Sequence, residues 1–218
     1  MAPRPYRVWK WMQLGFALLA RLRDPSGAEI VEFVVSLPLL IVTVVGVFDF
    51  GSAFIVRQKV INAVQVGARV ASKQPTTDLS AGAASCSAPS SICVLLDVID
   101  TTLKKSGLND CGLASAAAQQ PAPPNPVWTF TANTGCPGTL TLTIERGCVL
   151  GDPTCAATTS PPVTSPPFPT TPYLIEATRI TISYPYRWEF NRVISLLVGA
   201  SWSPSSQITS VAIMQNLN

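Results

Sequence analysis

The sequence predicts an α+β fold: a long N-terminal membrane-spanning helix, then a small disulfide-containing extracytoplasmic domain with an antiparallel sheet. Three observations predict it. Residues 30–48 form an apolar run with one charge, all six cysteines follow that run, and alternating strand patterns lie further along the chain. We expect a basic cytoplasmic leader over 1–27, a helix over 28–72 and the α+β domain over 73–218.

The composition and charge of the chain point to a membrane protein. Only 12% of its 218 residues are charged, against about 25% in a typical soluble domain. The net charge of +3 is uneven, because residues 1–27 carry +4 and the remainder carries −1. Without a concentrated basic face to neutralise phosphates, nucleic acid is not an expected partner. The basic leader instead suits the cytoplasmic flank of a membrane helix.

The leader contains an apolar stretch, Trp9 to Ala20, with roughly the length of a signal-peptide core. No small-x-small cleavage site follows it, and the sequence continues Arg-Leu-Arg-Asp-Pro instead. We therefore interpret the stretch as an amphipathic helix on the inner face of the membrane.

The apolar run itself reads Ile-Val-Glu-Phe-Val-Val-Ser-Leu-Pro-Leu-Leu-Ile-Val-Thr-Val-Val-Gly-Val-Phe over residues 30–48. This length is about enough to cross the ~30 Å hydrocarbon core of a bilayer. A buried helix of a soluble protein would normally show a polar face at helical period, and this run shows none. A single membrane span is the expected structure.

The helix is expected to continue beyond the membrane, because no proline occurs from Ala53 to Ser72 and Pro75 then ends the pattern. A helix over 28–72 would reach roughly 67 Å at ~1.5 Å per residue, which is longer than a bilayer is thick. Its outer half must pack on the protein's own domain or on neighbouring subunits. Apolar residues there keep an i, i+3, i+4 stripe: Val56, Val60, Ala63, Gly67 and Val70.

The cysteines give the orientation that the flanking charges leave open. An even number on one side of a span indicates disulfides in an oxidising compartment, which places the C-terminal part outside the cytoplasm. Six cysteines allow 15 pairings, and free buried thiols are the alternative. The chain has no His and no CxxC spacing, so a zinc site is disfavoured and no metal or other cofactor is expected. The disulfide candidates are Cys86, Cys93, Cys111, Cys136, Cys148 and Cys155.

The remaining domain shows one helical and several strand patterns. Apolar residues at helical spacing predict a helix over 92–105, capped by Ser90 or Ser91 and ended by Gly107. Leu140 to Ile144 and Ile180 to Tyr184 alternate with Thr and Ser, and residues 207–214 are expected to form the last strand. Proline-rich loops are expected at 121–126 and 161–172, and Val193 to Ala200 is apolar but too short to span.

The most informative motif precedes the apolar run: Gly27-Ala28-Glu29-Ile30-Val31-Glu32-Phe33. A glycine before a membrane helix, with a carboxylate five residues later, is the geometry of prepilin-type processing. A cytoplasmic peptidase cuts after the glycine, which lets the backbone enter a protease cleft in extended form. Glu32 would then lie just inside the membrane, where a carboxylate costs up to about 3 kcal/mol unless it is paired. The alternative is a Glu32 that reaches the interface and an ordinary turn at Gly27.

A longer stretch, from Arg23 to Ser72, resembles the TadE-like family of the tight-adherence (Flp-type) pilus system. The resemblance is carried by the motif above and by Leu37-Pro38-Leu39-Leu40, Phe48-Asp49-Phe50-Gly51, Phe54, Val56-Arg57-Gln58, Asn62-Ala63 and Gly67-Ala68-Arg69-Val70-Ala71. Asp49 stands where a glutamate is commoner in the family, and the proline- and cysteine-rich insertions are unusual.

The resemblance implies a pilin-like fold and a minor pseudopilin that takes part in pilus assembly. It implies cleavage between Gly27 and Ala28 by a prepilin peptidase, and residence in the bacterial inner membrane as a single-pass protein with a periplasmic or extracellular domain. Glu32 and Phe33 would set the register between subunits. The implied partners are other pilins or pseudopilins, the pilus assembly platform, the peptidase and inner-membrane lipid.

Other residues have more than one interpretation. Pro38 removes the backbone bond to Val34 and is a candidate helix kink. Asp49 is expected to be solvated rather than paired with a partner's cation. Arg57, Lys59 and Arg69 are expected at headgroups or in solvent. Trp188 and Phe190, beside Arg187 and Arg192, suit a membrane surface, a subunit interface or the core.

Catalysis is not expected, because without His the Ser-His and Cys-His systems are absent, and no GxSxG, P-loop or dinucleotide fingerprint occurs. Carboxylates such as Glu145, Asp152, Glu176 and Glu189 show no telling spacing. The alternative to an assembly subunit is a membrane-anchored periplasmic binding module whose helix is only an anchor.

Overall fold

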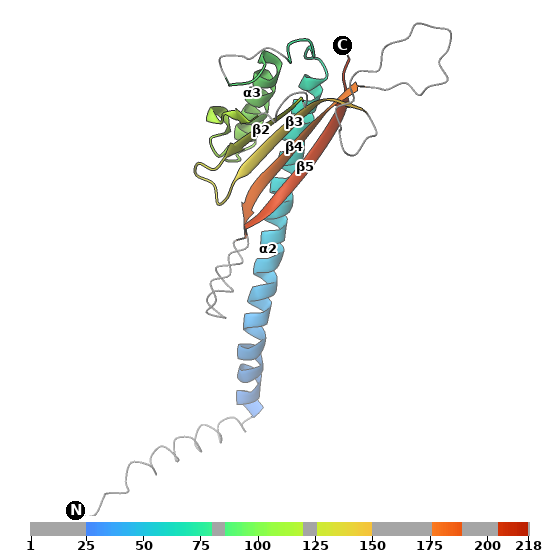
Figure 1. Ribbon diagram of the computed structural model, residues 1–218. Coiled ribbons are helices and arrows are strands. Elements are labelled where there is room, and N and C mark those ends of the chain that lie inside the picture. The colour runs from blue at the N-terminus through green and yellow to red at the C-terminus, as the bar shows by residue number, and fades with distance from the viewer. Residues whose placement is uncertain (1–24, 80–85, 120–125, 150–175, 189–204, 218) are drawn as a thin grey trace, which may run out of the picture. The chain divides into compact units, whose positions relative to one another are not determined.

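The computed structural model describes residues 25–79, 86–119, 126–149, 176–188 and 205–217. The chain divides into two compact units, Met1–Asp49 and Phe50–Asn218. Helix α2 runs from Pro25 to Ala71 and contributes residues to both units (Figure 1). The second unit contains α3 (Ser90–Lys105), the short 3-10 helix η1 (Leu113–Ser115) and one sheet. The predicted α+β class is confirmed.

The described residues form a sheet of five antiparallel strands in chain order, β1-β2-β3-β4-β5. The three predicted strands are confirmed within β3, β4 and β5, and β2 was missed although Trp128, Phe130 and Ala132 alternate at strand period. Their bounds are Ala118–Gln119 for β1, Val127–Ala132 for β2, Leu140–Val149 for β3, Glu176–Arg187 for β4 and Ser205–Gln215 for β5.

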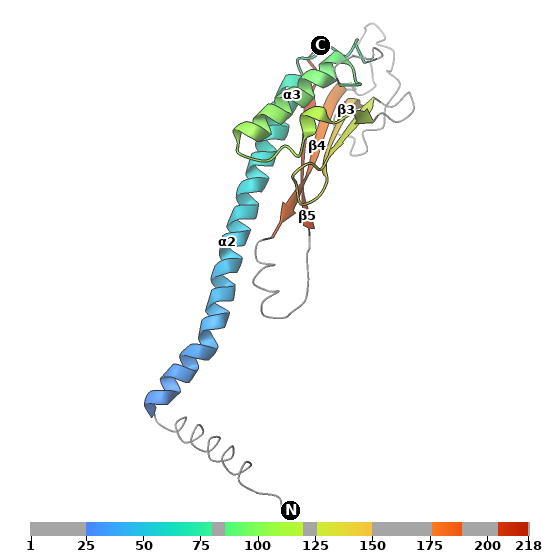
Figure 2. The same cartoon turned by 90° about the vertical axis from the view of Figure 1, so that its left-hand side faces the viewer.

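The two faces of the sheet follow from the alternation of side chains along each strand. Phe130, Leu142 and Ile182 are buried and lie opposite one another across β2, β3 and β4. Hydroxyl side chains predominate on the other face, where one row crosses four strands through Thr131, Thr141, Ser183 and Thr209. On β5 the same face also carries the exposed Val211 and Ile213. The apolar face therefore needs a covering layer, and helices provide it (Figure 2).

The outer half of α2 is part of that covering layer. The predicted stripe is confirmed, since Val60 and Ala63 are fully buried in the core with Val64, Ala68 and Ala71, while Val56 and Val70 pack partly buried at its edge. A Cβ on Gly67 would lie 2.7 Å from Cγ1 of Ile99 on α3 and 3.3 Å from Cδ1 of Ile180 on β4. Gly67 thus marks the point where α2 approaches both α3 and the sheet.

Helix α3 ends as the sequence predicts but begins differently. Gly107 has φ of 74°, and the amides of Gly107 and Leu108 bond to the carbonyls of Lys104 and Leu103, which is a Schellman motif. At the start the N-cap residue is Pro89, and no cap side chain bonds the helix. The expected serine cap is wrong: the Asp78 carboxylate accepts from the Ser91 amide at 2.9 Å and from both serine hydroxyls, because the chain leaving α2 brings that acid to the amides.

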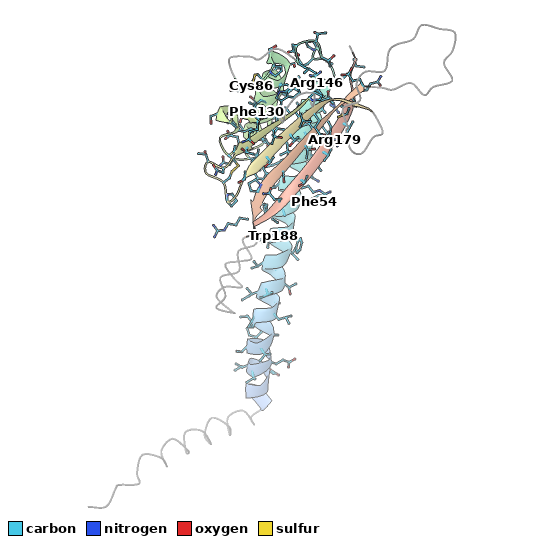
Figure 3. All side chains as sticks on the ribbon, in the orientation of Figure 1. Phe54, Cys86, Phe130, Arg146, Arg179 and Trp188 are labelled. Atoms are coloured by element: carbon cyan, nitrogen blue, oxygen red, sulfur yellow. A yellow bond between two sulfur atoms is a disulfide. The ribbon has the colours of Figure 1, made fainter. Side chains whose placement is uncertain are left out.

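A buried arginine joins the end of α2 to the sheet. Arg146 is 1% exposed, and its Nη2 donates to the Gln74 carbonyl at 2.9 Å (Figure 3). Burial lowers the pKa of Arg146, and the nearby Asp78 and Glu176 oppose that effect. Gly147 next to it, with φ of 78°, forms the bulge that shifts the register of β3 against β4. The guanidinium places a positive charge just past the C-terminal end of the helix, where the helix dipole favours it.

The close approach at Gly67 predicts a large stability difference between two glycine substitutions in the same helix. Gly67→Val should lower the free energy of unfolding by about 1–3 kcal/mol, because the added methyls overpack the contact with Ile99 and Ile180. Gly51→Ala is the matched control, since a Cβ there meets nothing within 4 Å, and it should be neutral or stabilising by up to about 1 kcal/mol. Denaturant unfolding of the detergent-solubilised chain measures both. Equal effects would contradict the packing.

The Asp78 cap predicts a pH-dependent contribution to stability. Burial acts to raise the pKa of Asp78, but the hydrogen bonds from Ser91 and Ser90 outweigh it and leave the pKa below 3.8. A lowered acid pKa stabilises the fold above the unfolded value, and that stability is lost as pH falls through the folded value. Asp78→Asn should cost about 1 kcal/mol at pH 7, with the deficit shrinking below about pH 4 in parallel melts. A deficit independent of pH would refute the charged cap.

Candidate functional site: an uncovered helix and its leader junction

The inner half of α2 has the exposure expected of a membrane span. The helix is long and apolar enough to cross a membrane, and none of its most apolar window is buried by the protein. Val35 is 72% and Leu39 73% exposed, whereas a core helix of a soluble protein would bury such residues. This part of the chain is therefore a candidate for burial in lipid or against other helices.

The few polar side chains in this half of α2 fall into two groups: hydroxyls that bond within the helix, and an exposed carboxylate. The hydroxyls of Ser36 and Thr43 donate to the carbonyls of Phe33 and Leu39, so neither needs a partner from outside the helix. Glu32 is exposed beside Ile30 and Phe33, which are 66% and 62% exposed, and no described residue forms an ion pair with it. The carboxylate is the one acid within the apolar run.

The predicted cleavage site lies at the start of the same helix. Helix α2 begins at Pro25 rather than Ala28, with proline in a position that suits the first turn. The Gly27–Ala28 bond is therefore in the first turn, where the backbone amides have no intrahelical partners and helices fray. A peptidase would need to open only this turn to bind the bond in extended form. Pro38, the candidate kink, lies inside α2.

Polar residues further along α2 differ in their surroundings. Arg57 and Arg69 are exposed, whereas Lys59 is half-buried and its Nζ lies close to Gly107 at the end of α3. Asp49 is 5% exposed and has an interaction partner, so the expectation that it is solvated is wrong. A carboxylate tolerates such burial when its charge is compensated.

The disulfide expectation is confirmed for the described cysteines. Cys86 is bonded to Cys93, and Cys111 to Cys136. Cys148 is also disulfide-bonded, and Cys155 lies outside the described residues. Both described bridges lie in the second unit, one just before and within α3 and the other linking the loop after α3 to the β2–β3 turn.

One acidic cluster escaped the sequence analysis. Lys104 Nζ lies 2.7 Å from Asp100 and 3.5 Å from Asp110. Burial raises the pKa of Asp100, and Asp110 adds to the effect while Lys104 opposes it. The i, i+4 spacing of Asp100 and Lys104 was the available signal, but Asp110 reaches them only through the turn after α3. Because Lys104 lies between the two acids, the three side chains form an ion-pair network that stabilises the end of α3, and they are not an acid–base pair.

The remaining residues singled out from the sequence either form ordinary structural contacts or lie outside the described part of the chain. Glu145 pairs with Arg179 across β3 and β4 on the hydroxyl-rich face of the sheet (Figure 3). Among the described residues no group of three or more His, Cys, Asp or Glu side chains is arranged to hold a metal ion. Phe190, Arg192, the apolar stretch 193–200 and residues 1–24 lie outside the described part of the chain, as do most of the two proline-rich segments.

Comparison with known proteins agrees with the resemblance noted in the sequence. Residues 27–69 match the family model described as TadE-like protein, so the resemblance is confirmed over nearly all of α2. No curated protein and no solved structure matches the chain. The matched segment begins at Gly27 and contains the uncovered helix half, Glu32 and most of the stripe that packs on the sheet.

The two described disulfides should differ in their effect on stability. Replacing Cys111 and Cys136 by Ser removes a bridge that spans 25 residues, whereas Cys86 and Cys93 are 7 apart. The longer loop restricts the unfolded chain more, so we expect losses of about 3 and about 2 kcal/mol respectively. Urea unfolding of the two double variants checks the order, and a larger loss for Cys86 and Cys93 would contradict it.

Proposed function

We propose that this chain is a minor pseudopilin that takes part in assembly of a tight-adherence (Flp-type) pilus through helix–helix packing. The observation that carries the proposal is the inner half of α2, whose most apolar window is buried by none of the described residues. The TadE-like match over residues 27–69 supports it, because the matched segment is this helix. The chain acts by associating with other subunits, and the peptidase's catalytic groups belong to the peptidase.

The proposed topology is a single pass through the bacterial inner membrane, with the N-terminus cytoplasmic and the sheet domain outside. The basic residues of the leader support a cytoplasmic start, and the disulfides support an oxidising compartment for the second unit. Cleavage between Gly27 and Ala28 removes the leader and leaves the amine of Ala28 at the front of the helix.

Glu32 gives the helix surface its specificity in this proposal. Apolar side chains attract any other helix in lipid with little preference for register, because lipid tails are equally apolar. A carboxylate among them is costly at membrane depth unless a cation meets it. The new amine on Ala28 of a neighbouring subunit is such a cation. Its pairing with Glu32 would fix the axial offset between the two helices, with Phe33 packing beside it.

A membrane-anchored binding module is the second candidate, and it is favoured by β5, the last strand of the sheet that the described residues form. β5 is an edge strand of eleven residues whose sequence contains no charged residue and no proline. Its pairing with β4 is continuous from Ser205 to Gln215 without a bulge. Edge strands of this kind are open to pairing with another chain. In that role α2 would serve only as an anchor.

Replacing Glu32 separates the two candidates. In cells that make the pilus, Glu32→Gln should reduce surface pili about tenfold, the effect of losing about 1.4 kcal/mol per subunit contact. Glu29→Gln is the matched control, because Glu29 is equally exposed on the same helix but lies before the apolar run. Both variants should be inserted and shortened like the parent chain, as judged by gel mobility of the membrane fraction.

Normal piliation by the Glu32 variant would refute the register role. Exchanging residues 28–50 for an unrelated span then decides between the candidates. The binding module predicts full function after the exchange, whereas the pseudopilin predicts its loss even though the chain remains in the membrane.

A further inference from the structure

Aromatic side chains gather in the second unit at the end of β4, where α2 enters that unit. The rings of Phe50 and Trp188 lie 5.3 Å apart in an edge-on arrangement, and Tyr186 and Trp188 lie 5.2 Å apart. Phe50 and Phe54 are one helical turn apart and are 70% and 58% exposed. Figure 3 shows Trp188 and Phe54 at the same end of the sheet. We name Phe50, Phe54, Tyr186 and Trp188 the aromatic collar; Tyr186 is its buried member, 9% exposed and in contact with Trp188.

The position of the collar along the chain relates it to the membrane. Residues 30–48 account for about 28 Å of helix, which matches the ~30 Å hydrocarbon core. Phe50 and Phe54 follow about 3 Å and about 9 Å further along the same helix, and the headgroup layer on one side is about 5–8 Å deep, so Phe50 lies within that layer and Phe54 at its outer edge. Trp188 reaches that layer through its contact with Phe50, although it lies 138 positions later in the sequence.

The chemistry of the collar suits the headgroup layer better than water or a dry core. Trp and Tyr prefer the membrane interface, because one end of each ring system is apolar and the other is polar. Two exposed cations, Arg57 on the next turn of α2 and Arg187 beside Trp188, are available to lipid phosphates. In water, Phe50 and Phe54 would keep most of their apolar surface exposed, since they are 70% and 58% exposed even with the Trp188 contact.

We propose that the aromatic collar rests in the outer headgroup layer of the membrane and holds the sheet domain directly on the lipid surface. The occupant of this surface is the phospholipid headgroup region, in continuity with the span of α2. The inference rests on the proposed membrane insertion but not on pilus assembly or leader cleavage.

The collar would also orient the domain. Phe50 contacts Trp188 at one end of the sheet, and at the other end the Leu217 amide donates to the Ser72 carbonyl at 2.9 Å. The outer half of α2 and strand β5 therefore run alongside each other in the same direction. The end of β4 with Arg187 would face lipid, and the end with Glu176 would lie about 36 Å further along the strand.

Brominated lipids test the proposal on the full chain. The protein is reconstituted in 3:1 phosphatidylcholine–phosphatidylglycerol vesicles in which the phosphatidylcholine carries bromines at either shallow (6,7) or deep (11,12) acyl positions. The Trp188 signal is the difference in emission between the parent chain and Trp188→Phe, a change that keeps a ring against Phe50. Shallow bromines should quench this difference about twofold, and deep bromines should quench it less.

Phe54→Trp provides a second measurement of quenching. Phe54 is exposed, so the added indole should disturb the packing of the domain little. It should show the same preference for shallow bromines. Trp128→Phe is the reference, because Trp128 is 1% exposed in the core and its contribution should not respond to brominated lipid.

The outcomes separate this inference from the membrane insertion on which it rests. If the protein floats with the vesicles but neither the Trp188 signal nor the indole added by Phe54→Trp is quenched, the collar faces water or a protein partner and the inference is wrong. If the protein does not float with the vesicles at all, the span itself is wrong and the inference falls with it.

Discussion

The structure depends on one constraint: a single continuous helix must satisfy two different surroundings. The inner half of α2 is apolar on every side, and the described residues bury none of its most apolar window. In its outer half the apolar residues narrow to a stripe that is buried against α3 and the sheet. Apart from the bond to the Val34 carbonyl, which Pro38 cannot donate, the interior of the helix satisfies its own backbone hydrogen bonds, and this permits the same element to continue from one environment to the other. Gly67 shows how tight the second environment is, because no side chain fits between α2 and Ile99 without displacement.

The division of α2 into an exposed inner half and a buried outer half explains how the rest of the second unit is built. A sheet with one apolar face needs a covering layer, and the outer part of α2 supplies one side of that layer. The other side is α3, which is held at its start by Asp78 and at its end by Lys104 between two acids. Arg146 ties the chain just past α2 to the third strand. The outer half of α2 is therefore part of the domain rather than a linker to it, and a change there is felt in the sheet.

The features that sequence could predict are those written in local periodicity. Four features could be predicted because each depends on spacing within a few residues: the apolar run, the stripe from Val56 to Val70, the Gly107 end of α3 and three strands. The features that were missed depend on contacts between distant residues. Asp78 caps a helix that starts twelve positions later, Asp110 joins Asp100 only after the chain turns, and Trp188 meets Phe50 across most of the domain. Strand β2 is an exception, since its alternation was visible in Trp128, Phe130 and Ala132.

The candidate site also shows that sequence predicts local patterns better than contacts with distant partners. Gly27, Ala28 and Glu32 were found because they stand in a recognisable order before an apolar run, and the match to a TadE-like family model covers them. Their proposed roles concern other molecules: a peptidase for the first two and a neighbouring helix for the third.

The N-terminal sequence of the native protein recovered from membranes tests this account most directly. Cleavage after Gly27 predicts a mature chain that begins Ala-Glu-Ile at Ala28, with the free amine that Glu32 of a neighbour requires. A native chain that still begins at Met1 or Ala2 in cells with normal pili would contradict the account, because no new amine would exist for the acid in the membrane to meet.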